Sequence, residues 1–237
     1  MRVQRALALA GVASRRAAEE LVREGRVQIN GEVATVGQPV EESDVLMVDG
    51  KRVSTEERRT YLLNKPVARV STASDPEGRP TVLDGMPTGV RLYPVGRLDY
   101  ASSGLLVITN DGELAHRLMH PSYRVPKTYE VLVEGRVSAA GIRRLRDGIR
   151  LDDGPTQPAR VDKMERLHPK GTWLRIEITE GRNRQVRRMC EAIGHPVRRL
   201  HRSRYAGISG GGLAKGAFRP LSGEEITRLA RLVGLER

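Results

Sequence analysis

The sequence has few aromatic residues, one cysteine and no long apolar run. Aromatic residues make up 3% of the 237 positions, so platforms for stacking bases must be few and an RNP-type stacking sheet is not expected. The single cysteine, Cys190, excludes an intramolecular disulfide and fits a reducing compartment. No apolar run reaches the roughly 18 residues of a transmembrane helix, and the basic N-terminus lacks the apolar core of a signal peptide. We expect a cytoplasmic protein with no membrane partner.

Positive charge is in excess, and it is unevenly distributed. The formal net charge is +12 and the isoelectric point is near 10.5, which favours a polyanionic partner, most simply nucleic acid. Residues 1–55 hold eight basic and eight acidic residues, so the excess resides beyond residue 55. Within that neutral segment four arginines nevertheless precede the first acid, Glu19. The segment is therefore neutral overall but polarised along the chain.

Residues 1–53 have the pattern of a small separate unit. Ser14 is a candidate N-cap for a helix that ends at Gly25. Turn signals at Asn30-Gly31 and Asp49-Gly50 separate short apolar runs and predict two hairpins. The helix should carry one apolar face, formed by Ala17, Ala18, Leu21 and Val22. Residues 54–60 (STEERRT) carry no core residue and are interpreted as a linker, after which residues 61–237 show a longer α+β pattern.

The stretch from Val95 to Gly112 (VGRLDYASSGLLVITNDG) places a charged pair, Arg97 and Asp99, before a small-residue turn and an apolar strand. One carboxylate therefore sits in a loop at the mouth of a buried strand, where polar chemistry is commonly mounted on a rigid scaffold. Taken alone, Asp99 is more simply explained as a turn-capping aspartate.

A second stretch, from Glu180 to Arg204, is rich in arginine. Residues 182–204 contain eight arginines and one acid, Glu191. A helix from near Asn183 to Gly194 would bury a stripe of Val186, Met189, Cys190 and Ile193. At helical spacing Arg187 lies at the edge of this stripe, whereas Arg184 and Arg188 lie opposite it. An alternative for Arg187 is a surface pair with Glu191.

Two further patterns contain residue types that bind metal ions. His116 and His120 have the i, i+4 spacing of a metal pair, but no third ligand follows at suitable spacing. Asp152 and Asp153 are followed by Gly154 and Pro155, which is typical of a turn. We therefore expect no metal site. Between these patterns, Tyr129 alternates with Val131 and Val133 on one face of a predicted strand.

Together these motifs resemble those of the pseudouridine synthases. GRLD, a small-residue turn, GLL and TND-G match the signature of that family, and LHR-SRY at residues 200–205 is similar to its large-subunit ribosomal RNA branch. GVASRRAAEELVREGRVQINGE at residues 11–32 resembles the alpha-L RNA-binding domain named after small-subunit ribosomal protein four. The resemblance implies an α+β protein with a small N-terminal RNA-binding domain of helices and hairpins. Its catalytic domain would hold a mixed, largely antiparallel sheet flanked by helices.

The resemblance also assigns candidate catalytic residues. It makes Asp99 the nucleophile, Arg187 the basic residue paired with it, and Tyr129 the ring that packs against the target base. We expect the pairing with Arg187 to keep Asp99 ionised. Other arginines are candidate RNA contacts, some by resemblance and some by position in the basic stretch: Arg15, Arg16, Arg97, Arg184, Arg188, Arg198, Arg199, Arg202 and Arg204.

The expected function is isomerisation of a specific uridine in a 23S ribosomal RNA hairpin, either free or in an assembling subunit, by a monomeric enzyme. The reaction involves no redox change or net hydrolysis, so no cofactor is expected. Two alternatives stay open, a 16S ribosomal RNA synthase of the same branch and a non-catalytic RNA-binding assembly factor. The chain departs from the family pattern at Ala68, where a glycine is usual, and at Ala101, where a polar residue is common.

Overall fold

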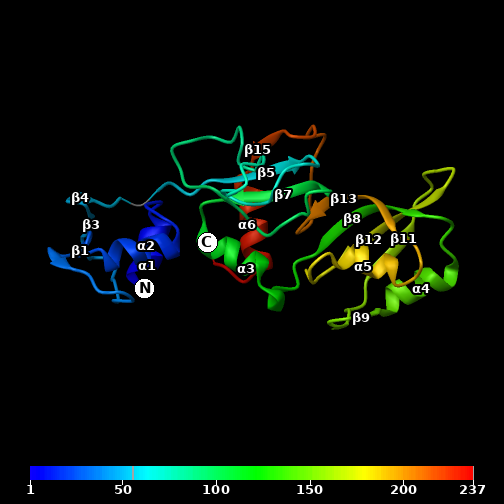
Figure 1. The fold of residues 1–237 in the computed structure, drawn as a ribbon, viewed down its shortest axis with the longest axis horizontal. Helices are drawn as coiled ribbons and strands as arrows, with labels where there is room; N and C mark the ends of the chain where they lie inside the picture. The colour runs from blue at the N-terminus through cyan, green and yellow to red at the C-terminus, as the bar shows by residue number, and fades with distance from the viewer. Residues whose placement is uncertain (55, 237) are drawn as a thin grey trace. The chain divides into compact units, whose positions relative to one another are not determined.

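The computed structural model describes residues 1–54 and 56–236 (Figure 1). Thr55 of the expected linker and Arg237 of the expected catalytic domain lie outside this part. The chain forms two compact units. The first comprises Met1–Arg59, Pro87–Leu92 and Asn110–Gly112, and the second comprises Thr60–Met86, Tyr93–Thr109 and Glu113–Arg237. In the described part of the chain, no helix is both long enough and apolar enough to cross a membrane.

The first unit contains two helices and a four-stranded antiparallel sheet in the order β2-β1-β3-β4. The elements are α1 (Val3–Leu9), α2 (Arg15–Arg23), β1 (Val27–Ile29), β2 (Glu32–Val33), β3 (Leu46–Val48) and β4 (Lys51–Arg52). Both predicted hairpins are confirmed. Asn30 and Gly31 turn the first hairpin with φ values of 53° and 90°, which a tight turn between twisted strands requires.

The predicted cap of α2 is also confirmed, since the Ser14 hydroxyl accepts a hydrogen bond from the Ala17 amide at 3.1 Å. Ala18 and Val22 pack on Leu7 and Val27 in the core of this unit. The prediction was wrong for Ala17, which is exposed. Ala17 lies in the first turn of the helix, where the buried stripe is narrower than the four-residue face expected from spacing.

The second unit is built on one large sheet in the order β11-β12-β8-β13-β7-β5-β15, with β14 paired to β13 and β6 paired to β7. The strands are β5 (Thr60–Lys65), β6 (Tyr93–Pro94), β7 (Ser103–Thr109), β8 (Lys127–Glu134), β11 (Arg160–Lys163), β12 (Gly171–Ile178), β13 (Val197–Tyr205), β14 (Ile208–Ser209) and β15 (Phe218–Pro220). A separate hairpin pairs β9 (Arg150–Leu151) with β10 (Gly154–Pro155). The pairing is antiparallel except between β13 and β7, which confirms a mixed, largely antiparallel sheet.

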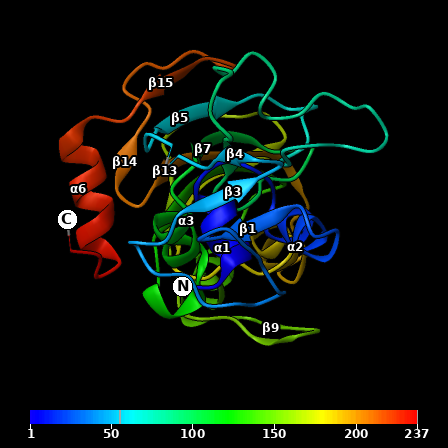
Figure 2. The same ribbon diagram turned by 90° about the vertical axis from the view of Figure 1, so that its left-hand side faces the viewer.

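Helices flank this sheet, as expected. They are α3 (Gly112–Met119), η1 (Pro121–Tyr123, a 3-10 turn), α4 (Ala139–Asp147), α5 (Gln185–Glu191) and α6 (Gly223–Leu232). Leu114 of α3 and Leu229 of α6 share a buried cluster with Leu62 of β5 and with Leu105 and Val107 of β7. Figure 2 shows α6 beside β14 and below β15. α5 packs against β13 and α4 against β11, so both halves of the sheet carry helices.

The parallel pair β13–β7 joins two antiparallel halves of the sheet at one point. His201 is opposite Ser103 and Arg202 is opposite Gly104, and the Ser103 hydroxyl lies 3.0 Å from His201 Nδ1. Gly104 has a φ of 117°, and a Cβ at this position would lie 2.3 Å from the Arg202 carbonyl oxygen and 2.4 Å from its amide nitrogen. Only glycine therefore permits both this backbone conformation and this close approach of the two strands.

The junction predicts a large effect of Gly104→Ala. Because the new Cβ would meet backbone atoms in an unfavourable φ region, the free energy of unfolding should fall by about 3 kcal/mol or more. Gly207→Ala is the matched control, since Gly207 also has a positive φ (79°) but no neighbouring atom within 4 Å. It should lose only about 1–2 kcal/mol. Chemical denaturation measures both, and equal losses would show that the strand junction tolerates a Cβ.

Candidate active site

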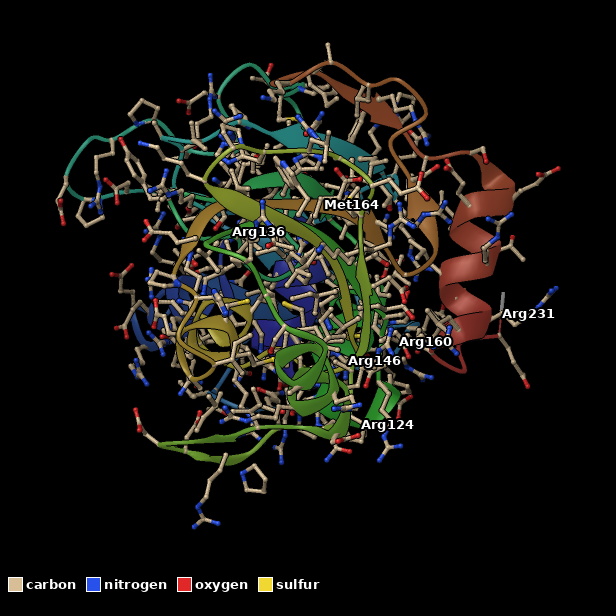
Figure 3. All side chains as sticks on the ribbon, turned by 90° about the vertical axis from the view of Figure 1, so that its right-hand side faces the viewer. Arg124, Arg136, Arg146, Arg160, Met164 and Arg231 are labelled. Atoms are coloured by element: carbon tan, nitrogen blue, oxygen red, sulfur yellow. The ribbon has the colours of Figure 1, made fainter. Side chains whose placement is uncertain are left out.

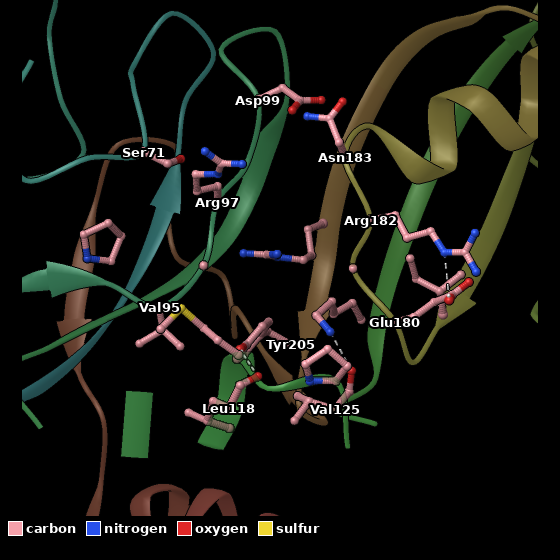
Figure 4. Close-up of a pocket in the computed structure, with 18 of the residues that line it drawn as sticks. Ser71, Val95, Arg97, Asp99, Leu118, Val125, Glu180, Arg182, Asn183 and Tyr205 are labelled. Carbon is pink, nitrogen blue, oxygen red and sulfur yellow. Dashed lines mark hydrogen bonds and ion pairs between the residues drawn. The ribbon is translucent and has the colours of Figure 1, made fainter. Parts of the chain in front are cut away.

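A cavity of about 560 Å³ opens between the two halves of the sheet (Figure 4). Its lining comes from the segment before β7, the C-terminal end of α3, β8, the segment after β12, and β13. The strands part beyond the short parallel junction, which is why segments distant in sequence meet here. Five residues predicted from sequence line this cavity: Arg97, Asp99, Tyr129, Arg184 and Arg202. In Figure 4 the side chains of Asp99 and Asn183 point toward each other from opposite segments.

Hydrogen bonds from Lys65, the last residue of β5, hold the loop that carries Asp99. Lys65 has 0% exposure, and its Nζ donates hydrogen bonds to the carbonyl oxygens of Pro66 (3.1 Å), Asp99 (3.1 Å) and Ser102 (2.8 Å). Burial lowers the pKa of Lys65 to about 8, an effect that the Asp99 carboxylate opposes. Lys65 thus pins both ends of the four-residue turn 99–102. Nothing in the local sequence around Lys65 predicts this role, because the Asp99 and Ser102 carbonyls lie 34 and 37 residues further along the chain.

Two further contacts fix the same loop from the segment after β5. The Ser71 hydroxyl donates to the Leu98 carbonyl at 2.8 Å and accepts from the Leu98 amide at 3.1 Å. The Ala68 amide donates to the Tyr100 carbonyl at 2.8 Å. Ala68 has a φ of 62°, the left-handed region, which explains why glycine suits this position. The departure at Ala68 therefore keeps the backbone conformation at some cost in strain.

Arg187 holds the loop from the other side. Its side chain is 8% exposed, and its Nε lies 3.6 Å from Asp99 Oδ2, within ion-pair distance but longer than a hydrogen bond. Nη2 donates to the Ala101 carbonyl and the Ser102 hydroxyl, both at 3.2 Å, and Nη1 donates to the Val197 carbonyl at 3.3 Å. The burial of Arg187 agrees with its position at the edge of the apolar stripe of α5. Burial and the nearby Arg184 lower the pKa of Arg187, while Asp99 raises it, and an arginine remains charged.

This arrangement leaves the Asp99 carboxylate accessible. The side chain is 34% exposed and faces the cavity, while the buried guanidinium lies behind it. Arg187 Nε has no hydrogen-bond partner among the described residues. The ion pair therefore supplies opposite charge without occupying the carboxylate in a close hydrogen bond. Such a carboxylate can act as a nucleophile or a base toward a group held in the cavity.

Three residues of β8 and β13 also line the cavity: Tyr129, Lys127 and Arg202. Tyr129 is buried on β8 and lines the cavity. Arg202 was expected as a phosphate contact, but it is 2% exposed, its Nε donates to the Leu105 carbonyl at 2.7 Å, and its guanidinium lies 4.9 Å from the centre of the Tyr205 ring. It is therefore part of the cavity wall and not an exposed surface arginine. Burial lowers the pKa of Lys127 to about 8, and Arg202 acts in the same direction.

The other candidate RNA contacts differ in their surroundings. Arg97, Arg184, Arg199 and Arg204 are exposed, as are Arg15 and Arg16 on α2 of the first unit. Arg188 instead makes a two-pronged ion pair with Asp153, at 2.9 Å and 3.0 Å, and Arg198 pairs with Glu134 at 3.0 Å. α5 begins two residues later than predicted because Arg184 has a φ of 46° and interrupts the helical backbone.

Basic residues outside the cavity lining also lie on the surface of the second unit. Arg124, Arg136, Arg146 and Arg160, labelled in Figure 3, are all exposed. Arg146 and Arg160 pair with Asp162 and Glu177 at 3.2 Å and 3.6 Å. The positive charge of this unit is therefore not concentrated at the cavity alone, and part of it is balanced by neighbouring acids.

The two histidines considered as a metal pair lie near the cavity without forming a ligand cluster. His116 and His120 have ring centres 5.6 Å apart, and His120 Nδ1 lies 2.7 Å from the Ser122 hydroxyl. Within residues 1–54 and 56–236, no group of three His, Cys, Asp or Glu residues is arranged to hold a metal ion. His120 instead caps the 3-10 turn η1.

The contacts of Lys65 predict that Lys65→Met destabilises the protein. Three largely buried carbonyls would lose their hydrogen-bond donor. This loss outweighs the gain from no longer burying a charged group, so the free energy of unfolding should fall by about 2 kcal/mol or more. Lys170→Met removes an exposed lysine and serves as the control. Denaturant unfolding of both variants measures the effect. A Lys65→Met protein as stable as the wild type would contradict a clamping role.

Comparison with known proteins identifies the family of this chain. The family model described as RNA pseudouridylate synthase matches residues 59–192, and the S4 domain model matches residues 1–46. The chain is 48% identical, over 98% of its length and 96% of the relative, to a Bacillus subtilis protein named ribosomal large subunit pseudouridine synthase B. It is 43% identical, over its full length, to an uncharacterized RNA pseudouridine synthase of Aquifex aeolicus, of which 96% is covered.

A solved structure extends this similarity to three dimensions. A pseudouridylate synthase crystal structure superposes with a TM-score of 0.70 at 29% identity, covering 97% of this chain and 99% of that one. The match covers both units, and the family model spans Lys65, Asp99, Tyr129 and Arg187. The chain therefore belongs to the RNA pseudouridylate synthase family, whose members are isomerases, and it carries an RNA-binding S4 domain at its N-terminus.

Proposed function

We propose that this protein isomerises one uridine of large-subunit ribosomal RNA to pseudouridine, with Asp99 as the nucleophile. The observation that carries the proposal is the accessible Asp99 carboxylate at the cavity, 3.6 Å from the buried Arg187 guanidinium. The name of the Bacillus subtilis relative supports the large ribosomal subunit as the target. The LHR-SRY segment, on β13 beside the cavity, supports the same branch.

The chemistry of the reaction is compatible with such a cavity. The N1–C1′ bond of uridine breaks, the base turns, and a C5–C1′ bond forms. The target base must first leave its stack, at a cost of a few kcal/mol, and the detached base must then be retained. A cavity of about 560 Å³ is within the usual range for small-molecule sites. No electrons are gained or lost and no water is consumed, so the reaction itself calls for no cofactor.

The surrounding residues have distinct proposed roles. Arg187 places a positive charge 3.6 Å from the Asp99 carboxylate and so balances the charge of the proposed nucleophile. The Tyr129 ring packs against the uracil. The exposed Arg97 and Arg184, both at the cavity, contact phosphates on either side of the flipped nucleotide. The exposed Arg199 and Arg204 extend this contact along β13.

The two parts of the chain have separate proposed roles. Residues 1–53 bind RNA through Arg15 and Arg16 on α2, residues 54–60 form a connection, and residues 61–237 catalyse the reaction. Both arginines are exposed, and Ser14 caps the helix that presents them. If each contacts a phosphate, replacing both by alanine should reduce the slope of log affinity against log salt by about one to two. An unchanged slope would remove the proposed contact.

The protein is proposed to act as a cytoplasmic monomer. The residues that line the cavity all belong to one chain. The single cysteine, Cys190, is buried, and burial raises the pKa of its thiol to about 12, so it is not placed to form a disulfide with a second copy. Light scattering of the purified protein measures its mass directly. A dimer that dissociates with loss of activity would contradict this proposal.

A further prediction concerns the proposed catalytic pair. Asp99→Asn should abolish pseudouridine formation while RNA binding persists, because the amide keeps the shape but cannot act as the carboxylate does. Arg187→Ala should strongly reduce turnover, and the double variant should be no worse than Asp99→Asn, since the two residues act as a unit. Single-turnover assays on a ribosomal RNA fragment measure these rates.

Two controls sharpen this test. Asp147→Asn changes an exposed carboxylate of α4 and should leave turnover unchanged. Glu191→Gln removes the alternative partner of Arg187. Turnover of Asp99→Asn within tenfold of the wild type would rule out the proposed role of Asp99. Coupling of Arg187 to Glu191, with none to Asp99, would identify Arg187 as part of a surface pair.

Another prediction concerns which ribosomal RNA the protein modifies. In cells that lack this protein, a pseudouridine map of ribosomal RNA should lose one site in the large-subunit RNA. Expression of the wild type should restore that site, and expression of Asp99→Asn should not. Loss of a small-subunit site instead would identify the alternative synthase. An unchanged map would support a non-catalytic RNA-binding role.

A further inference from the structure

One wall of the cavity is attached to the separate hairpin β9–β10. Residues 179–184, here called the wall segment, line the cavity opposite Asp99. The hairpin, residues 150–155, does not line the cavity, yet it contacts this segment through charged side chains. Since the wall segment is a connection between β12 and α5 and not part of a strand, its position depends on such contacts.

Asp153 at the hairpin turn is the centre of these contacts. Its carboxylate receives two hydrogen bonds from Arg188 of α5, at 2.9 Å and 3.0 Å. The Nε of the same arginine donates to the Asn183 carbonyl at 3.0 Å. Arg188 therefore links Asp153 directly to the backbone of the wall segment. A planar guanidinium bound at both edges fixes distance and orientation together.

Arg182, within the wall segment, makes a second link to the same turn. Its Nη1 lies 3.4 Å from Asp153 Oδ1 and donates to the Gly154 carbonyl at 3.0 Å, and its Nη2 donates to the Pro155 carbonyl. Its Nε lies 3.3 Å from Glu180 Oε2, an ion pair that is drawn dashed in Figure 4. Two arginines thus converge on one carboxylate. The hydrogen bonds from Arg188 lower the pKa of Asp153, and the positive charge of Arg182 acts in the same direction.

The hairpin is itself firmly anchored. The Thr156 amide donates to the Ile149 carbonyl at 2.8 Å, and the Ile149 amide donates to the buried Thr156 hydroxyl at 2.9 Å. In contrast, the wall segment ends at Arg184, which has a φ of 46°. A non-glycine residue in this region needs support from its surroundings. The base of the hairpin is therefore held by its own hydrogen bonds. The wall segment is attached to this region by the two arginines and by the Gln157 amide, which donates to Glu180 Oε1 at 3.0 Å.

We propose that Asp153 is a positioning residue for catalysis, which holds residues 179–184 against the cavity through Arg188 and Arg182. In this role Arg188 serves the wall, and its guanidinium is engaged by Asp153 in place of a phosphate. The proposal rests on the proposed function for its kinetic consequence, because the cavity must hold a uridine for the wall position to affect turnover. The attachment of the wall can be measured without any reaction.

The test compares Asp153→Asn with Asp152→Asn in the full chain. Both remove one exposed carboxylate from the same turn, but Asp152 has no part in the contacts described. Asp153→Asn should lower kcat by about 10- to 100-fold, because a small misplacement of a positioning wall suffices for such losses, with little change in KM. Amide hydrogen exchange in residues 179–184 should become faster. Asp152→Asn should match the wild type in both measurements.

Arg188→Gln completes the cycle. It should lower kcat as Asp153→Asn does, and the double variant should be no worse than either single variant. The proposal is overturned if kcat of Asp153→Asn stays within about twofold of the wild type, if exchange is unchanged, or if the two losses add. A rise in KM with kcat unchanged in Arg188→Gln would instead identify a phosphate contact. If the wild type forms no pseudouridine, the function fails, while exchange still tests the attachment.

Discussion

Two buried cations, Lys65 and Arg187, fix the position of the loop that carries Asp99, and the geometry of the rest of the site depends on their contacts. Lys65 binds the carbonyls at both ends of the turn, and Arg187 binds its middle and its last hydroxyl. A buried charge is costly unless it is hydrogen-bonded or paired. Most of their hydrogen bonds go to this one short loop, from Lys65 to the Asp99 and Ser102 carbonyls and from Arg187 to the Ala101 carbonyl and the Ser102 hydroxyl. Moving the loop would therefore leave both buried charges without these partners. The loop backbone is thereby fixed while its carboxylate stays open to the cavity.

The architecture explains how these cations reach one loop. Lys65 is at the end of β5 in one half of the sheet, and Arg187 is on α5, which packs on β13 of the other half. The halves meet where Gly104 lies against the backbone of Arg202. This contact is immediately after the loop, so the close approach of the strands also sets how far Arg187 is from Asp99. The strand junction and the ion pair of Asp99 with Arg187 are consequently one structural unit.

Much of the local structure could be predicted from sequence because it follows from short-range rules. Asn30-Gly31, the Ser14 cap and the buried stripe of α5 depend on neighbours a few residues away. The structure agrees with the first two and buries Val186, Met189 and Cys190 of the stripe, but α5 ends at Glu191, so the predicted end at Gly194 was wrong and Ile193 lies beyond the helix, half-buried. The burial of Arg187 also follows from helical spacing. Asp99 as a candidate needed several distant motifs together, because a lone aspartate before a strand is ordinary.

The missed features depend on tertiary contacts that spacing cannot reveal. The two ends of the turn held by Lys65 lie 34 and 37 residues along the chain from it. The burial of Arg202 depends on the strands that flank it, and from its neighbours in sequence it looked like another exposed arginine. The pairing of Arg188 with Asp153 joins residues 35 positions apart. In the sequence, Lys65, Arg188 and Arg202 each look like one more basic residue of a basic protein. They differ only in their tertiary surroundings.

The arginine-rich stretch shows why this distinction matters for function. Its formal excess suggested a row of phosphate contacts, but its members divide into three groups. Arg187 and Arg202 are buried at the cavity. Acids pair with Arg182, Arg188 and Arg198, and the remaining members, Arg184, Arg199 and Arg204, are exposed to solvent. A paired arginine must give up its carboxylate before it can release counterions from RNA, so it adds less to affinity than an exposed one. Positive charge in this stretch therefore has two structural settings, since part of it is exposed to solvent and part of it is buried or paired with acids.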